Sequence, residues 1–377
     1  QTANDNTAVG YFALKANTTG QHNVGVGNSS LAANTTANAN TAVGYLAGAS
    51  NTTGSANCAF GKDALYTNTT GSNNTSIGQG TLYYNTTASY NTAVGRNALA
   101  ANTTGYNNNA VGYEALTANT TGVNNVAFGY QAGDSITTGN YNTALGNLSL
   151  SAVTTTDANV AVGYEALKSC TALGNVAIGF QAMEATTTGS DCVAVGYNAL
   201  TANTASHNTA VGFKALEDNN SGVRNTAVGD RALQHCIVVS SGEARDNTAV
   251  GKDALNDCTT GYQNTAIGTH AGDNMTVGYN NVYVGDNAGN SHVNGDRCVY
   301  VGRAADCSST SRSLEYVFGH GIVGKGEQTF FAGGNTGAYN EANQSSWQTT
   351  SDRRIKKNIT NNTTGLDKIN QITVRNF

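Results

Sequence analysis

The 377-residue sequence contains no proline, although average usage of roughly 5% would predict about 19. A chain without proline keeps every backbone N–H available as a donor, which continuous strand-to-strand ladders require. Charged residues are also scarce, at 11% of the chain, about half of their usual share. The apolar residues are mostly Ala and Val, so any core is thin. These properties argue against two or three globular domains with separate cores, which length alone would suggest.

Several functional signals are absent as well. No secretory signal, transmembrane run or lipidation motif is visible, so we expect no membrane insertion. The seven cysteines include no C-x-x-C pair of the kind that holds zinc. Glu and Asp occur singly at different positions, which gives no carboxylate pair typical of a glycosidase. We therefore expect no metal, no cofactor and no nucleic-acid partner.

The sequence instead repeats one short unit about nineteen times. The Gly of A-V-G recurs every 17 residues, apart from two steps of 16 and one step of 22 between Gly229 and Gly251. Residues 1–320 therefore form a single array. We call these residues the marker glycines: Gly10, Gly27, Gly44, Gly61, Gly78, Gly95, Gly112, Gly129, Gly146, Gly163, Gly179, Gly196, Gly212, Gly229, Gly251, Gly268, Gly285, Gly302 and Gly319.

Each unit contains a short run of β-forming residues that ends at the marker. Asn stands four residues before most markers, and a β-branched or large apolar residue stands immediately before them. Ala and usually Leu follow three and four residues after the marker, and an N-T-T-G turn comes next. This pattern indicates one strand per unit, with the Ala-Leu pair forming a second short strand or a bend. We predict an all-β parallel β-solenoid (β-roll or β-helix) of about nineteen 17-residue coils.

Stacked coils explain why the unit is repeated. Coils about 4.8 Å apart would give a rod of roughly 90 Å and place equivalent side chains in columns along its axis. We expect the Asn column to form a side-chain amide ladder, and the marker column to show where the backbone bends or is closely approached. One Val or Ile and one Leu facing inward per coil would bury little against the entropy of ordering the chain. We therefore predict a parallel homotrimer.

Three other recurring features leave alternatives open. Cys236 and Cys258 both lie seven residues after a marker and could bridge adjacent coils, although buried thiols are the favoured interpretation. The N-T-T triplets match glycosylation sequons, but their fixed place in the repeat favours turns. Tyr recurs directly after the marker, where ladder packing is favoured over a surface that stacks carbohydrate.

The one long repeat contains a candidate contact loop. Its sequence Q-H-C-I-V-V-S-S-G-E-A-R-D carries five extra residues, which must leave the coil. Loops on a regular scaffold often carry contacts. We therefore predict a surface contact through His235, Glu243 and Arg245, with a tolerated insertion as the alternative.

The composition changes after the last marker. Residues 321–345 are rich in Gly and aromatic residues, which is typical of a capping or transition zone. Residues 351–377 hold six Lys or Arg and two Asp, a net charge of +4, which leaves −9 for the rest of the chain. An acidic rod therefore ends in a basic segment, and we expect a separate domain to begin within residues 346–377.

Two parts of the sequence resemble known families. The unit N-T-A-V-G-Y-x-A-L resembles the head repeats of trimeric autotransporter adhesins, which implies a trimeric left-handed parallel β-roll. This chain departs from that family in its longer period and its N-T-T-G segment. Arrays of this period are also similar to those of phage and other viral fibre proteins, so the array alone leaves both families open.

The segment S-D-R-R-I-K-K-N-I closely resembles the opening motif of the endosialidase-type intramolecular chaperone, the self-cleaving C-terminal domain of phage tail fibres and tailspikes. The resemblance implies a catalytic dyad of Ser351 and Lys356, in which a Lys of depressed pKa would take the Ser proton. It also implies that residues 346–377 are the truncated start of that domain. The alternative is an exposed basic tail in which Ser351 does no chemistry.

These observations predict a structural and receptor-binding shaft of a viral or phage tail fibre, located on the virion and matured by a self-cleaving chaperone. Its expected partners are two further copies of the chain, other virion tail proteins and a host glycan or protein receptor. The mature fibre is not expected to be an enzyme. The alternatives are a bacterial trimeric adhesin on the cell surface and a fibre-borne glycan hydrolase.

Overall fold

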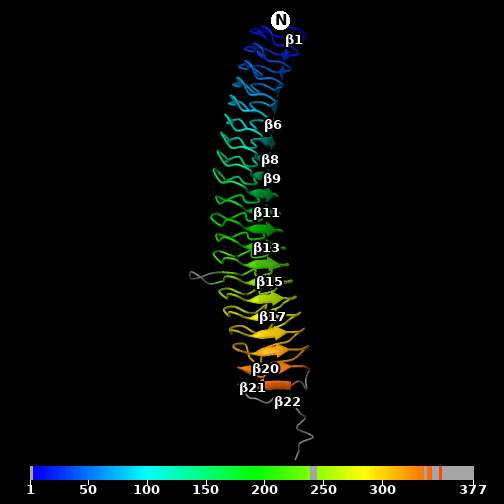
Figure 1. Cartoon of the computed structure of the whole chain (residues 1–377), viewed down its shortest axis with the longest axis vertical. Helices are drawn as coiled ribbons and strands as arrows, with labels where there is room; N and C mark the ends of the chain where they lie inside the picture. Colours follow the sequence, from blue (N-terminus) through cyan, green and yellow to red (C-terminus); the bar gives the residue numbers. More distant parts are fainter. Residues whose placement is uncertain (1–2, 238–243, 335–337, 342–347, 350–377) are drawn as a thin grey trace, which may run out of the picture.

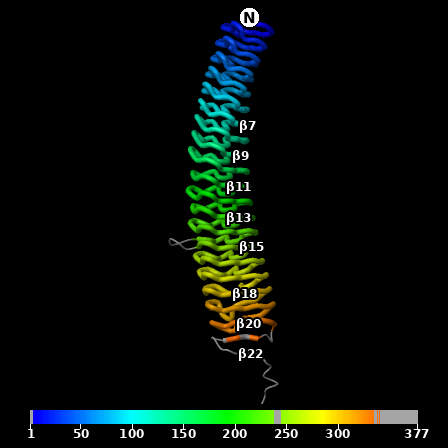
Figure 2. Tube along the Cα trace, in the orientation of Figure 1, coloured from blue at the N-terminus to red at the C-terminus, as the bar shows by residue number. Residues whose placement is uncertain are grey.

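The computed structural model is an elongated, gently curved rod of stacked coils (Figure 1). It describes residues 3–237, 244–334, 338–341 and 348–349. The chain trace shows each coil lying directly on the one before it, from the N-terminal end to residue 334 (Figure 2). Within the described residues the structure contains strands and turns but no helix. The predicted all-β parallel β-solenoid of about nineteen turns is confirmed.

Each coil contributes one three-residue strand to a single sheet that runs along the rod. The solenoid strands are β1 (Thr7–Val9), β2 (Val24–Val26), β3 (Thr41–Val43), β4 (Cys58–Phe60), β5 (Thr75–Ile77), β6 (Thr92–Val94), β7 (Asn109–Val111), β8 (Val126–Phe128), β9 (Thr143–Leu145), β10 (Val160–Val162), β11 (Val176–Ile178), β12 (Val193–Val195), β13 (Thr209–Val211), β14 (Thr226–Val228), β15 (Thr248–Val250), β16 (Thr265–Ile267), β17 (Val282–Val284), β18 (Val299–Val301) and β19 (Tyr316–Phe318).

The strands pair in parallel, with each residue facing its equivalent in the next repeat. In β3 and β4, for example, Ala42 lies opposite Ala59. β14 and β15 keep this register across the 22-residue repeat, so the insertion does not disturb the sheet. β20 (Thr329–Ala332) continues the parallel pairing with β19, whereas β21 (Ala338–Glu341) and β22 (Gln348–Thr349) add antiparallel strands. The domain boundaries placed at residues 320 and 345 stay a prediction.

The Ala-Leu segment forms a bend that is also bonded to both neighbouring coils. Asp63 donates its backbone N–H to the Tyr45 carbonyl of the preceding coil, and Leu65 donates to the Thr81 carbonyl of the following coil. Leu65 has a left-handed φ of 55°, as do the equivalent leucines. That conformation costs an L-residue roughly 1–2 kcal/mol, but burying a Leu side chain returns about as much. Of the two predicted alternatives, the bend is correct.

The marker glycines are required by close approach of the backbone. Gly61 has a φ of +134°, and a Cβ added there would lie 2.6 Å from the carbonyl oxygen of Gly78 in the next coil. A real Cβ does not come this close to another heavy atom, so every coil turns this corner with glycine. The prediction that the marker column is a site of bending and close approach is confirmed.

The core contains smaller side chains than the sequence suggested. The middle residue of each strand faces inward, and the residue before the marker does not. The middle strand residue, usually Ala, is buried together with the Ala and Leu that follow the marker. The Val, Ile or Phe before the marker points outward instead: Phe60 is 55% and Ile267 is 45% exposed. The expectation that this residue fills the core was wrong. In a three-residue strand the first and third side chains share one face, and here that face is outside.

Asn residues in the column before each strand form the expected ladder. Asn91 accepts the backbone N–H of Asn108 at its Oδ1 (2.9 Å) and donates its Nδ2 to the Gly105 carbonyl (2.9 Å). The same pattern recurs in the neighbouring coils, where these Asn side chains are almost fully buried. The ladder satisfies backbone groups at a turn that no strand partner could reach.

Candidate functional site

The outward side of β1–β19 is a continuous apolar surface, which we call the strand face. It consists of the first and third residues of each of these strands. The third residues are Val, Ile, Leu or Phe throughout, and the first are mostly Thr or Val. Neither column contains a charged residue in any of the nineteen coils. An exposed apolar strip of this length is uncommon on a protein that acts alone.

A second exposed column lies directly after the marker glycines, and aromatic residues occupy it in several coils. Tyr113 stacks on Tyr130 with ring centroids 5.4 Å apart. A longer stack has centroids 5.1–5.5 Å apart and contains Tyr164, Phe180, Tyr197 and Phe213. Because neighbouring rings cover one another's faces, mainly their edges meet solvent. The favoured interpretation of this column, ladder packing, is confirmed for these residues.

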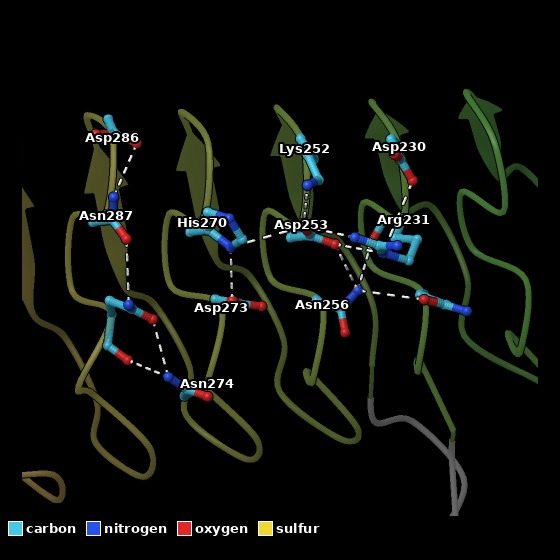
Figure 3. A network of polar contacts seen from close by, with 12 residues as sticks. Asp230, Arg231, Lys252, Asp253, Asn256, His270, Asp273, Asn274, Asp286 and Asn287 are labelled. Atoms are coloured by element: carbon cyan, nitrogen blue, oxygen red, sulfur yellow. Dashed lines mark hydrogen bonds and ion pairs between the residues drawn. The ribbon is translucent and has the colours of Figure 1, made fainter.

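A network of charged side chains joins the coils of β14–β17 (Figure 3). Arg231 binds Asp253 of the next coil through two bonds, at 2.7 and 3.0 Å. His270 lies between Asp253 and Asp273, with its Nδ1 3.8 Å from the first carboxylate and 2.9 Å from the second. The sequence analysis treated the acidic residues as isolated, and it missed this grouping. The signal was present, because Arg231, Asp253 and His270 all lie two residues after a marker.

The network gives its two carboxylates different properties. The Arg231 guanidinium, through its hydrogen bonds and charge, lowers the pKa of Asp253. Burial raises the pKa of Asp273, and its bond to His270 only partly opposes this effect. Pairs of carboxylates with diverging pKa values occur in active sites. Here, however, Asp253 is held by the guanidinium of Arg231 in the preceding coil, and Asp273 bonds His270 of its own coil, as in a structural network.

The predicted contact loop is only partly described. His235 lies 2.9 Å from Asp218 through its Nδ1. Arg245 lies over the ring of Tyr262 and 3.6 Å from Asp246. Glu243 is outside the described residues. His235 and Arg245 therefore both contact neighbouring coils, and a role for the loop in binding stays a prediction.

The predicted catalytic residues Ser351 and Lys356 lie outside the described residues. The structure therefore neither brings them together nor separates them. Autoproteolysis at this junction stays a prediction from the sequence motif.

The N-T-T asparagines form a second amide ladder, which we call the N-T-T column. Asn102 donates its Nδ2 to Oδ1 of Asn85 (2.9 Å) and to the Gly105 carbonyl of its own turn (2.9 Å). The column runs without interruption from Asn17 to Asn119, and from Asn34 onward its members are buried. Thr103 bonds the Thr120 carbonyl of the next coil. The turn interpretation of the triplets is confirmed, because glycosylation needs an accessible amide.

All seven cysteines are free thiols, and all but Cys58 are buried. Burial raises the pKa of Cys258 to about 12 and that of Cys236 well above its usual value. A thiol in this state is a poor nucleophile. The favoured interpretation of small buried thiols is confirmed for these six residues.

The last coils contain a buried polar cluster that the sequence analysis missed. The hydroxyl of Tyr283 lies 2.7 Å from Nδ1 of His292, whose Nε2 lies 2.8 Å from the Arg312 carbonyl. Tyr300 donates to Oε2 of the buried Glu315 (3.2 Å). A signal was available: Tyr283 and Tyr300 replace the inward Ala of the strand where Gly replaces the usual Leu, at Gly272 and Gly289. A Cβ at Gly272 would lie 2.8 Å from the Tyr283 ring.

Two kinds of site are absent from the part of the chain that the structure describes. Within the described residues, no helix is long and apolar enough to span a membrane. No group of three or more His, Cys, Asp or Glu side chains in the described part of the chain is arranged to hold a metal ion.

Comparison with known proteins adds no assignment. The sequence matches no protein-family model and no curated protein. The parallel β-solenoid of 17-residue turns is therefore the level at which the chain is identified.

Proposed function

We propose that the chain forms the shaft of a trimeric fibre that projects from a virus or phage and attaches it to a host surface. The observation that carries this proposal is the strand face, an uncharged apolar strip that follows the rod from β1 to β19. A strip roughly 90 Å long and one three-residue strand, about 10 Å, wide presents on the order of 900 Å². Standard stable interfaces bury about 800 Å² per partner, so the strand face is large enough for one.

The proposed occupant of the strand face is another copy of the same chain. Each coil presents the same columns at the same height, so parallel copies in register would match Thr or Val with Val, Ile or Phe along the whole rod. Burying these residues would also supply the apolar burial that the thin Ala and Leu core lacks. The resemblance to adhesin head repeats favours three copies around a shared axis over two. A heterologous contact that failed to close would instead produce open filaments.

The resemblance of the C-terminal motif to the intramolecular chaperone favours a virion fibre over a cell-surface adhesin. In the proposed maturation, the chaperone would bring three chains together and then leave after cleavage near Ser351. The proposed partners beyond the trimer are other virion tail proteins and a host glycan or protein receptor. The adhesin remains the second candidate, because the strand face would serve either fibre equally well. Within the described residues, the charged network at Asp253 and Asp273 is the observation that bears on the third candidate, a glycan hydrolase.

The test is the mass of the native assembly, measured by light scattering after size exclusion and by native mass spectrometry. We expect three times the 38.6 kDa chain mass. The double variant Phe128→Lys with Ile178→Lys places charges on the strand face and should yield monomers. The matched control, Thr104→Lys with Thr121→Lys, adds the same charge at exposed turn residues and should leave the assembly intact.

A monomeric parent protein would overturn the trimeric shaft. Equal loss of assembly in the control would show that added charge, rather than the strand face, disrupts the association. Cleavage near residue 351 when the chain is expressed with a C-terminal chaperone domain, abolished by Ser351→Ala, would support the viral fibre over the adhesin.

A further inference from the structure

A hollow lies on the surface of the rod in its N-terminal half. A shallow, open depression of about 290 Å³ is lined by Gly80, Tyr83, Tyr84, Asn97, Ala100 and Thr117. These residues come from three consecutive coils, those of β5, β6 and β7, and lie on the bend beyond the marker glycines. The volume is close to the lower end of the range for small-ligand pockets, roughly 300 Å³.

Three departures from the repeat create this depression. Gly80 has no side chain where its neighbours in the column carry Asp63 and Asn97. In the column five residues after the marker, the side chains step from Tyr66 and Tyr83 down to Ala100. Tyr84 also stands where the surrounding coils have small residues. The large Tyr83 and Tyr84 side chains thus form a wall, and the small residues Gly80 and Ala100 form the floor beside it.

The glycine at the floor of the depression makes room for an amide group. A Cβ on Gly80 would lie 2.8 Å from Oδ1 of Asn97, so any other residue would displace the Asn97 side chain. The left-handed backbone does not explain this glycine, because the equivalent residues Asp63 and Asn97 adopt the same conformation with side chains. The close approach of Asn97 therefore gives Gly80 a specific role.

The aromatic wall is rigid but open on one side. Tyr83 stacks on Tyr66 with centroids 5.1 Å apart and meets Tyr84 edge to face at 4.7 Å. Tyr84 is 56% exposed, unlike the rings of the long aromatic stack, whose faces cover one another. The charges beside the depression cancel. Lys62 lies 2.8 Å from Asp63, and Glu114, which bonds the Asn97 side chain, interacts with the opposite charge of Arg96.

We propose that this depression binds an uncharged pyranose of a host surface glycan. The C–H groups of a sugar ring would pack on Tyr84, and its hydroxyls would bond the Asn97 amide and the phenol and Thr117 hydroxyls, which both donate and accept. The lack of a net charge favours a neutral sugar over a sialic or uronic acid. This inference rests on the proposed attachment function and names its ligand class. Three such sites at one height of a trimer would add avidity to a weak single site.

The test uses saturation-transfer NMR on the full 377-residue chain, with methyl glycosides of neutral hexoses and of N-acetylhexosamines as probes. We expect millimolar binding of at least one probe. Tyr84→Ala should weaken it about tenfold, and Ala100→Leu, which fills the floor, should abolish it. Tyr90→Ala is the matched control, because it removes another exposed tyrosine nearby and should leave binding unchanged.

Several outcomes would overturn the site. Absence of binding by all neutral probes, or equal weakening by Tyr90→Ala, would exclude a pyranose site here. Stronger binding of sialic acid than of the neutral probes would exclude the proposed class. The assembly mass of each variant separates this result from the shaft proposal: a trimer that binds no sugar retains the shaft and loses the site, and a monomer that binds sugar does the reverse.

Discussion

The coils of β1–β7 and those of β17–β19 have the same backbone path but different side chains in their interiors. In the N-terminal coils, small Ala residues and the N-T-T column occupy the interior. In the C-terminal coils, Tyr283 and Tyr300 take the Ala position, His292 takes the N-T-T position, and Glu315 takes a position of the first Asn ladder. Tyr283 bonds His292, and Tyr300 bonds Glu315. The strands of both regions keep the same register and the same inter-coil pairing. The marker glycines and inter-coil bonds therefore specify the fold, and the interior is exchangeable if volume and polar partners are conserved.

In the C-terminal coils, a large side chain in the strand is matched by a small residue at the position that it contacts. A Tyr in the strand is accommodated because the Leu that would meet it is absent, and Gly272 and Gly289 stand in its place. Its hydroxyl then needs a partner, which His292 supplies from the position that Asn occupies elsewhere. The strand Ala, the Leu after the marker and the N-T-T Asn are thus replaced together. Protein interiors are close-packed, so one of these changes alone would leave a cavity or an overlap.

The largest loss of stability should come from substituting the marker glycines, which both regions contain. Gly61→Ala and Gly285→Ala should each destabilise the fold by about 3 kcal/mol or more, because both add a Cβ against the next coil at a disfavoured φ. Local hydrogen exchange of the adjacent strands would measure this, since long repeat arrays do not unfold in two states. Gly321→Ala is the control for the contact, because its φ of +60° is also left-handed but a Cβ there meets nothing within 4 Å, so its cost should be smaller. If either marker substitution left the local stability unchanged, close backbone approach at the marker glycines would not be what specifies the fold in both regions.

An intermediate effect should distinguish positions within the N-terminal coils. Asn85→Ala removes the two bonds that Asn85 donates and the bond that its Oδ1 accepts from Asn102, which should cost about 3 kcal/mol. Asn119→Ala should cost roughly 1–2 kcal/mol less. Asn119 ends its ladder, and its Oδ1 has no hydrogen-bond partner in the described structure because Ile136 follows it in the column. Exchange rates of the amides in each coil provide the comparison, and equal costs would show that the ladder ends do not differ.

The repeat period, the single strand per coil, the role of the marker glycines and the first Asn ladder were all predictable from the sequence. They are predictable because each depends on one column that meets its own copy above and below. The direction of the Val and Ile side chains was not. A three-residue strand T-A-V gives two faces of similar hydrophobicity, and only the path of the whole coil decides which is inside.

Contacts between different columns were also beyond the sequence analysis. Tyr283 and His292 are nine residues apart and meet only because the coil folds across its own interior. The depression at Gly80 likewise needs residues from three coils and three columns. Ser351 and Lys356 are a different case, because the sequence motif alone suggests their role.

The smallest effect should appear only in the C-terminal coils and only in acid. His292 is neutral in the fold: its Nε2–H donates to the Arg312 carbonyl, and its Nδ1 accepts the Tyr283 hydroxyl. Burial lowers the pKa of His292, although Arg312, Glu315, Asp306 and Asp296 partly oppose this. Because the pKa of His292 is lower in the folded than in the unfolded chain, its contribution to the stability of the fold is fully present above the ordinary value of about 6.5. That contribution is lost as the pH falls below this value. Local exchange around β17 and β18 should therefore show a loss of stability in mild acid, while β5 and β6 should not change. His292→Asn, which restores the residue of the N-terminal coils, should flatten this dependence, whereas His22→Asn, at an exposed histidine, should not. An equal acid response in both regions would show that the difference between their interiors does not control stability.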